Sequence, residues 1–257
     1  QVMIASMFLH MARVYFTESY RKPREITWML GIALMGISMG LGFTCYSLIC
    51  YQLSYWATVV GTNIAGATPI IGHYLLLFMR GGEEVTQSTL TRFFVFHVAL
   101  LPAALMVILA LHIFFVHCQG LHYEEEAQGK SEKGFYPFFP EHILNEIGIF
   151  LVLIASFTIF SYFFHPKLGE PFNPDVTPEH IKPEWYFFSV FRYLKLVSYQ
   201  IGILGNLFIG MCLFFWPFID QLFEKWFGVK GAKFTRYVLG MSFVVVWAVF
   251  TVWETVS

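Results

Sequence analysis

Two histidines stand 15 positions apart in one apolar run, a spacing that indicates cofactor chemistry inside a membrane. His97 and His112 both lie within Phe93–Val116, which contains no Asp, Glu, Lys or Arg. At about 100° and 1.5 Å per helical residue they fall on nearly the same face, about 22 Å apart along the axis. An imidazole among lipid-facing residues is costly and therefore functional by default. The pair predicts two cofactors stacked along one path of electron transfer.

Haem iron is the cofactor that best fits these histidines. A b-type haem in a helical bundle needs two imidazoles, small residues beside the ring and cations for its propionates. His10 is expected to be the second ligand opposite His112, with Arg13 one turn away for a propionate. Alone, His10 would more often be a hydrogen-bonded residue between helices. The second ligand opposite His97 is expected upstream of residues 1–16, which resemble the second half of a membrane helix, so we expect the chain to be a fragment.

The composition places the chain in the membrane class. Of its 257 residues, 57% are hydrophobic and 13% are charged. The net charge of −1 gives no indication of a nucleic-acid partner, and we expect none. The four cysteines form no C-x-x-C motif, which argues against zinc, iron–sulfur and c-type haem sites. A disulfide between Cys45 and Cys50 is disfavoured, because residues five apart on a helix point to different faces.

Hydropathy and length predict an all-α, polytopic transmembrane bundle, in which a haem-binding four-helix part precedes C-terminal membrane helices. The expected membrane segments are Gln1–Phe16 (in part), Thr27–Cys50, Phe93–Val116, Ile143–Phe164, Ile201–Ile219 and Tyr237–Trp253. Tyr51–Leu90 is too interrupted by glycine to span, and is expected to form short helices at one membrane surface. Two connectors remain: the polar Gln119–Pro140, and His165–Glu184, whose five prolines exclude a continuous helix.

Lysine and arginine are distributed unevenly if these segments alternate across the membrane. One side receives ten: Arg13, Arg21, Lys22, Arg24, Lys130, Lys133, Lys225, Lys230, Lys233 and Arg236. The other receives six: Arg80, Arg92, Lys167, Lys182, Arg192 and Lys195. The excess favours the first side as cytoplasmic, so that Tyr51–Leu90 and the proline-rich connector share the opposite, positive side.

Pro183-Glu184-Trp185-Tyr186 follows the proline-rich connector. A carboxylate held between aromatic residues at a membrane surface can bind a quinol hydroxyl and take its proton. Alone, the same four residues would more often be an interfacial anchor. Small residues recur along Thr27–Cys50, where either a flat ring or a neighbouring helix could approach: Gly31, Gly36, Gly40 and Gly42.

Together these features resemble the cytochrome b family, the quinol-oxidising core subunits of cytochrome bc complexes, over essentially the whole chain. Besides the histidine pair, the resemblance rests on four strings: Phe8-Leu9-His10-Met11-Ala12-Arg13, Gln52-Leu53-Ser54-Tyr55-Trp56-Ala57, Leu90-Thr91-Arg92-Phe93-Phe94 and Pro183-Glu184-Trp185-Tyr186. The 15-residue histidine spacing is similar to plastid-type and some bacterial forms. The fused C-terminal helices are similar to mitochondrial and many bacterial forms. The mixture implies a bacterial menaquinol or related complex.

The resemblance implies two b-type haems and a role for each matching residue. His10 and His112 match ligands of the high-potential haem on the negative side. His97 matches one ligand of the low-potential haem on the positive side. Arg13 and Arg92 match residues near the propionates, and Gly31 is expected to give the ring clearance. 

Quinol and quinone are the substrates that the resemblance implies. Glu184 and Tyr46 match catalytic residues that line the quinol-oxidation pocket. His117 matches a quinone contact at the reduction pocket, and His142 stands where an acid is usual in that pocket. The implied domains are 1–118 for the haem-binding part with its first helix and part of its second missing, 119–140 for a connector, and 141–257 for the C-terminal part.

One short stretch departs from the family pattern of Gly-Tyr-x-Leu-Pro-Trp. This chain reads Cys45-Tyr46-Ser47-Leu48-Ile49-Cys50. A side chain at Cys45 where a glycine clears the low-potential haem would overpack at a cost of about 1–3 kcal/mol. Either the haem, the helix or the oxidation pocket is then expected to differ from the family pattern.

The function implied is a dihaem subunit of a quinol–cytochrome c (or plastocyanin-like acceptor) oxidoreductase. It would oxidise quinol by bifurcation, transfer electrons across the membrane and reduce quinone on the negative side, with proton translocation. The expected partners are a Rieske iron–sulfur protein, a c-type cytochrome, membrane lipid and a second copy of the complex, in a bacterial inner membrane. Two alternatives remain: a dihaem anchor of a dehydrogenase or hydrogenase without bifurcation, and a non-redox transporter or scaffold.

Overall fold

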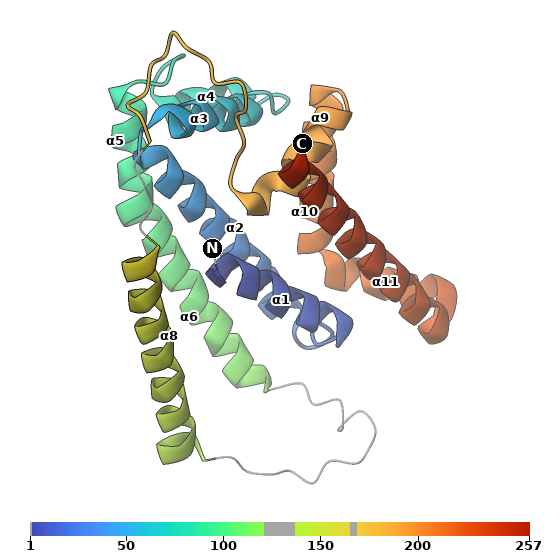
Figure 1. The fold of residues 1–257 in the computed structure, drawn as a ribbon. Coiled ribbons are helices and arrows are strands. Elements are labelled where there is room, and N and C mark those ends of the chain that lie inside the picture. Colours follow the sequence, from blue (N-terminus) through green and yellow to red (C-terminus); the bar gives the residue numbers. More distant parts are fainter. Residues whose placement is uncertain (1, 121–136, 165–168) are drawn as a thin grey trace. The chain divides into compact units, whose positions relative to one another are not determined.

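Helices account for every regular element of the residues that the structure describes, which are 2–120, 137–164 and 169–257 (Figure 1). This computed structural model contains no β-strand within those ranges, which confirms the predicted all-α class. Four described helices are long and apolar enough to cross a membrane: Glu25–Leu48, Gln87–Gln119, Phe138–Phe163 and Trp216–Val256. Val2–Phe16 and Tyr199–Phe214 are shorter apolar helices.

The described residues divide into two units, one of residues 2–120 and 171–257 and one of the described residues between them. The second unit consists of η2 (Phe138–His142), a π-helical turn, followed by α8 (Ile143–Phe163). α8 confirms the predicted segment Ile143–Phe164. Residues 121–136 and 165–168, which belong to the two predicted connectors and include Lys130, Lys133 and Lys167 of the charge count, lie outside the described part of the chain.

The predicted haem-binding part is built from α1 (Val2–Phe16), α2 (Glu25–Leu48) and one long helix made of α5 (Gln87–Val95), η1 (Phe96–Leu100) and α6 (Leu101–Gln119). α2 packs along α6. The long helix begins at Gln87 instead of the predicted Phe93, because a capping box fixes its start. Thr86 Oγ1 accepts a hydrogen bond from the Ser88 N–H at 3.3 Å, and Thr89 Oγ1 accepts one from the Thr86 N–H at 3.1 Å.

The element η1 is a π-helical turn in the middle of this long helix. The Leu101 N–H donates to the Phe96 carbonyl, five residues earlier. Pro102 follows at the start of α6; it has no N–H, and its ring would crowd the carbonyl four residues before it. The wider turn relieves that crowding and contains His97, so the turn occurs at a residue predicted to be functional.

Two short helices, α3 (Gln52–Gly66) and α4 (Gly72–Arg80), confirm the helices predicted within Tyr51–Leu90. Arg80, which is buried, joins them. It donates to Thr62 Oγ1 and Asn63 Oδ1, both at 2.8 Å, and to the Val59 carbonyl at 3.0 Å. The α3–α4 pair is thus held by an internally satisfied cation.

The C-terminal helices are η3 (Trp185–Phe187), α9 (Phe188–Leu196), α10 (Tyr199–Phe214) and α11 (Trp216–Val256). Two predicted boundaries are wrong. α10 ends before the predicted Ile219, because Pro217 begins the next helix. α11 begins well before the predicted Tyr237, because helix continues through the polar stretch that hydropathy excluded, with one break at Gly228 (φ +69°).

A buried ion cluster, here called the Arg236 cluster, joins the loop after α1 to α11. Arg236 and Asp220 are 3% and 1% exposed, and Arg236 Nη1 lies 2.8 Å from both carboxylate oxygens of Asp220. Glu18 lies 3.2 Å from Arg236, and Arg21 lies 3.2 Å from Asp220 and 2.7 Å from Glu224. Arg21 and Arg236 therefore lie together, as expected for residues counted on the same side.

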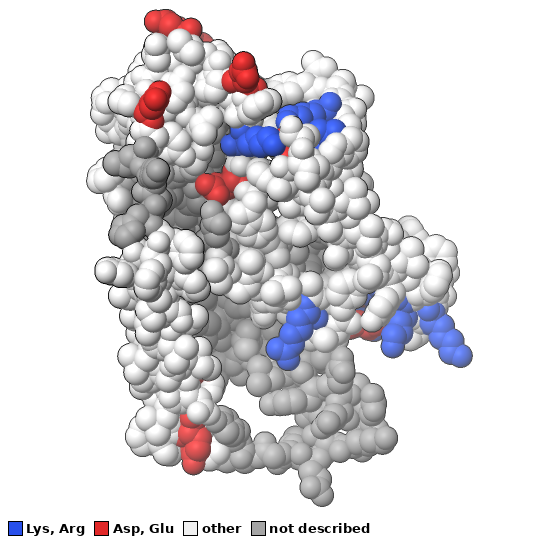
Figure 2. Space-filling view, in the orientation of Figure 1, with Lys and Arg blue, Asp and Glu red and all other residues white. Residues whose placement is uncertain are grey.

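A second cluster joins α9 to the end of α11. The Glu254 carboxylate is fully buried, with Lys195 Nζ 2.5 Å from its Oε1 and Arg192 Nη1 3.7 Å from its Oε2. Lys182 Nζ donates to the Glu254 carbonyl at 2.9 Å, and the Arg192 guanidinium lies 3.7 Å from the ring centre of Trp253. On the face drawn in Figure 2, Lys and Arg side chains lie in two groups with an uncharged band between them. That pattern suits helices that cross a membrane.

We predict that Asp220→Asn lowers the free energy of unfolding by about 3–5 kcal/mol, because it leaves the buried Arg236 charge poorly compensated. Thermal unfolding of the purified protein in detergent measures the change. Glu224→Gln is the matched control: the Glu224 side chain is 34% exposed, so its loss should cost no more than about 1 kcal/mol. Equal losses in the two variants would contradict the structural role of the buried pair.

Candidate functional site

The two histidines of the long apolar helix both face α2. A Cβ built on Gly31 would lie 3.4 Å from His112 Cε1. His97 lies towards the other end of α2, with its Nδ1 3.0 Å from Thr44 Oγ1. The prediction that His97 and His112 share one face of their helix is confirmed by these contacts.

Both imidazoles direct Nδ1 at α2. His112 Nδ1 is buried and close to the backbone of Thr27, although no hydrogen bond of normal geometry joins them. Gly31, one turn after Thr27, leaves room for this approach. A metal-bound histidine commonly directs its second ring nitrogen at a carbonyl or hydroxyl oxygen. The described residues therefore fit a separate b-type haem at each of the two histidines. Each histidine would bind the iron of its own haem through Nε2.

The remaining glycines of α2 bear on the two alternatives raised by the sequence, which were room for a flat ring and room for a neighbouring helix. A Cβ at Gly40 would meet only Leu101, at 3.8 Å, and a Cβ at Gly36 would meet nothing within 4 Å. At Gly42, a Cβ would overlap the Tyr186 hydroxyl. Gly31 thus makes room for an imidazole. Gly40 makes room for a neighbouring helix, and Gly42 makes room for an aromatic side chain.

The other histidines assigned from the sequence lie apart from this contact with α2. His10 on α1 is exposed, yet lies near enough to His112 for its charge to act on that imidazole. Arg13, one turn further along α1, and His117, near the end of α6, are also exposed. His142 belongs to the second unit, where its ring centre is 5.5 Å from that of Phe138, and its role beside His117 stays a prediction.

Arg92 makes its described contacts with α4. Its Nη1 donates to the carbonyls of Phe78 at 2.6 Å and Leu77 at 3.4 Å. These are carbonyls at the end of a helix, where a cation is favourable. Nothing tests a role for Arg92 beside a propionate, which stays a prediction.

Glu184 lies within electrostatic range of Tyr46, the residue assigned with it from the sequence, and their shared role stays a prediction. The Glu184 charge acts on both Tyr46 and Tyr186. Tyr46 lies in the last turn of α2, and its hydroxyl accepts a hydrogen bond from the Tyr51 hydroxyl at 3.2 Å. Tyr186 is 4% exposed, and burial, followed by the Glu184 charge, raises the pKa of its hydroxyl to about 12. This phenol therefore keeps its proton at neutral pH and remains a hydrogen-bond donor beside the carboxylate.

Sequence reasoning did not assign Tyr51 or Tyr186 to this group. Tyr186 lies in a string compared with the family and Tyr51 directly precedes one, but only their contacts across helices reveal the association. The glycine at 42, one turn before Tyr46, was the available signal, because a residue without a side chain on that face admits the Tyr186 hydroxyl.

The described part of the proline-rich connector holds this group in place against α3. Pro171 pairs with Tyr51 in an isolated antiparallel bridge. Phe172 stacks on Tyr55 with ring centres 4.8 Å apart, and Trp56 Nε1 donates to the Val176 carbonyl at 3.1 Å. The connector therefore leads from α3 directly to Glu184.

The departure from the family pattern is accommodated by the backbone. Cys45 and Cys50 are free thiols, in agreement with the disfavoured disulfide. α2 ends at Leu48 without a proline, and Cys50 takes a left-handed conformation (φ +53°) instead. A non-glycine residue there costs on the order of 1–2 kcal/mol. Cys45 lies near Tyr186.

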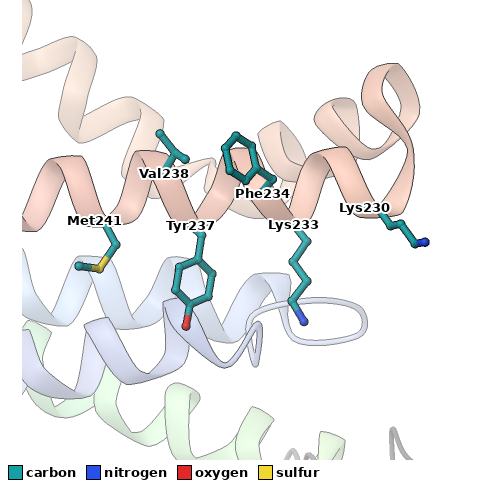
Figure 3. A pocket seen from close by; sticks show the side chains of 6 residues that line it. All are labelled: Lys230, Lys233, Phe234, Tyr237, Val238 and Met241. Atoms are coloured by element: carbon teal, nitrogen blue, oxygen red, sulfur yellow. The ribbon is translucent and has the colours of Figure 1, made fainter.

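A shallow groove lies on a different part of the molecule, along α11. Figure 3 shows its lining, which comes from that helix alone and is apolar apart from two lysines: Lys230, Lys233, Phe234, Tyr237, Val238 and Met241. The lining contains no histidine, cysteine or carboxylate. Among the described residues, no group of three or more His, Cys, Asp or Glu could hold a metal ion.

Two family descriptions match the chain and together cover nearly all of it. Cytochrome b(N-terminal)/b6/petB matches residues 1–175, and cytochrome b(C-terminal)/b6/petD matches residues 171–255. The chain belongs to the cytochrome b family.

Relatives of this cytochrome b include bacterial proteins. It is 35% identical over 222 residues to "Cytochrome b" of Rickettsia prowazekii (84% of this chain, 56% of the relative). It is 37% identical over 229 residues to "Cytochrome bc complex cytochrome b subunit" of Chlorobaculum thiosulfatiphilum (86% and 53%). The chain thus spans about half the length of these curated relatives. A solved structure titled "Hyperthermophilic respiratory Complex III" matches with a TM-score of 0.72 and 25% identity, covering 97% of this chain and 74% of that one.

This cytochrome b is an integral, multi-pass protein of a bacterial inner membrane. Its family binds b-type haem, and the two imidazoles directed at α2 fit that cofactor.

We predict that Gly31→Val lowers the ratio of haem to protein, because the added methyl groups push the His112 imidazole away from α2. A pyridine haemochrome assay on the purified protein measures the ratio. Gly36→Val on the same helix is the control, because a Cβ there meets nothing within 4 Å. Wild-type haem content in Gly31→Val would argue against this glycine as the clearance for His112.

Proposed function

We propose that this cytochrome b is the dihaem core of a quinol-oxidising bc complex. His97 would hold one haem, and His10 with His112 would hold the other. Haem bound at these histidines supplies a one-electron redox couple at each of two depths in the bundle. The relatives named as parts of bc complexes support this proposal.

The single observation that carries the proposal is the continuity of the two candidate sites along α2. Thr44 contacts His97, and Tyr46, two residues later and on the opposite side of α2, is within range of the Glu184 charge. A quinol bound at Glu184 would therefore lie about one helix diameter, on the order of 10 Å, from the first haem site. One-electron transfer needs such closeness, and a simple membrane anchor does not need the carboxylate.

In this proposal, the side chains handle the protons of the quinol. The Glu184 carboxylate accepts a hydrogen bond from one quinol hydroxyl and takes its proton. The Tyr186 and Tyr46 hydroxyls orient the substrate, and Tyr186 keeps its proton at neutral pH. Oxidation of one quinol releases two protons and two electrons. One electron goes to a high-potential iron–sulfur protein of the Rieske type, and the other crosses the membrane.

The second half of the proposed reaction reduces quinone on the negative side. His117 would contact the quinone, and His142 would donate a proton to it. Arg13 and Arg92 would pair with haem propionates. A c-type cytochrome as electron acceptor and a dimeric complex, with proton translocation as the result, complete the proposal.

The main alternative is a dihaem anchor that exchanges electrons with quinone without bifurcation. It would keep the histidines but would not need Glu184 beside Tyr46, or the α3–α4 pair. Two haems of distinct potential and copurification of a Rieske-type protein would support the bc complex. A subunit without b-type absorbance would point to the third reading, a non-redox transporter or scaffold.

We predict that Glu184→Gln slows quinol oxidation by about 10²–10⁴-fold, because the amide cannot take the proton. Reduced-minus-oxidised spectra of both haems should be unchanged, since none of the proposed haem ligands is altered. Steady-state turnover of the complex with a quinol analogue measures the effect.

Glu179→Gln is the matched control for this variant. Glu179 lies five residues earlier and is exposed on the connector, so the variant should retain wild-type turnover. Unchanged turnover in Glu184→Gln would remove the carboxylate from the proposed mechanism.

A further inference from the structure

Thr44 is a buried hydroxyl shared between its own helix and a histidine of the neighbouring one. It is 5% exposed, and its Oγ1 lies 2.9 Å from the Gly40 carbonyl, 3.1 Å from the Leu41 carbonyl and 3.0 Å from His97 Nδ1. A hydroxyl has one proton and two lone pairs. In the interior of a helix, threonine commonly directs that proton to the carbonyl four residues earlier.

This arrangement favours one tautomer of the neutral His97 ring. If the Thr44 hydroxyl donates its proton to the Gly40 carbonyl, Oγ1 can only accept a hydrogen bond from His97. That hydrogen bond requires a proton on Nδ1. Nε2 of the neutral ring then has the free lone pair, which is the form that can bind iron. The hydroxyl therefore selects both the tautomer and the orientation of the ring.

The π-helical turn η1 helps to bring His97 to this hydroxyl. In a regular α-helix, 15 residues turn through about 1500°, roughly 60° more than four full turns. A turn closed by hydrogen bonds to the fifth residue back rotates the chain less per residue, which removes part of that excess. His97 lies within η1 and is thereby turned towards α2, where Thr44 is located.

We propose that Thr44 is a positioning residue for His97 and lowers the reduction potential of the haem bound there; this inference rests on the proposed function of His97 as a haem ligand. A hydrogen bond from Nδ1–H to an acceptor makes the imidazole a stronger electron donor through Nε2. A stronger donor stabilises oxidised over reduced iron. Within residues 2–120, 137–164 and 169–257, His112 Nδ1 has no hydrogen bond to a hydroxyl, so we expect the effect at one haem only.

The test is an optical redox titration of the assembled complex with Thr44→Val, which keeps the shape but removes the hydroxyl. We expect the midpoint potential of one haem to rise and that of the other to stay at its wild-type value. A tenfold loss of preference for oxidised iron corresponds to a rise of about 59 mV for one electron. Thr44→Ser, which restores the hydroxyl, should return the potential towards wild type.

Ser47→Ala is the matched control. Ser47 is a buried hydroxyl on the same helix whose described hydrogen bond goes to the Phe43 carbonyl, at 2.9 Å, so its loss should move neither potential. A Thr44→Val protein that titrates like wild type overturns the inference, as does an equal shift of both haems. If Thr44→Val does not assemble, Thr44→Cys offers a weaker acceptor: a smaller rise in the same haem supports the inference, and no rise overturns it.

The outcomes separate this inference from the proposed function. A wild-type protein without two resolved b-haem potentials would contradict the proposed function itself. Two resolved potentials that Thr44→Val leaves in place would contradict only the role of Thr44.

Discussion

An imidazole in an apolar helix must find a polar partner, and α2 provides the contact for both His97 and His112. It does so by different means at its two ends. Gly31 removes a side chain, so that one ring can approach the backbone, while Thr44 presents a hydroxyl to the other ring. The close packing of α2 along the long helix is therefore the constraint on which both candidate haem sites depend.

The same helix, α2, also contributes residues to the candidate quinol site. Tyr46 follows Thr44 within one turn, and Gly42 receives the Tyr186 hydroxyl from η3. η3 is in turn followed by α9, which the buried Glu254 carboxylate holds to α11. The C-terminal helices thus act at a distance, by fixing the segment that presents Glu184.

Much of this arrangement could be predicted from the sequence because it follows from period and composition. The spacing of His97 and His112 fixes their common face whatever the partner helix is. The acid at 184 could be placed at a membrane surface from its neighbours. The Thr44 contact could not be found in this way, because it depends on how two helices are rotated against each other. The start of α11 was missed because packing of Asp220 and Arg236 stabilises helix where hydropathy is low.

The π-helical turn η1 has a consequence for how chains of this kind can vary in length. A π-helical turn holds one residue more than an α-helical turn. Removing one residue there would let the helix take regular α geometry. The segments before and after it could keep their positions, and both histidines would still point at the same neighbour. Insertions and deletions elsewhere between the histidines would instead rotate one ring out of the bundle.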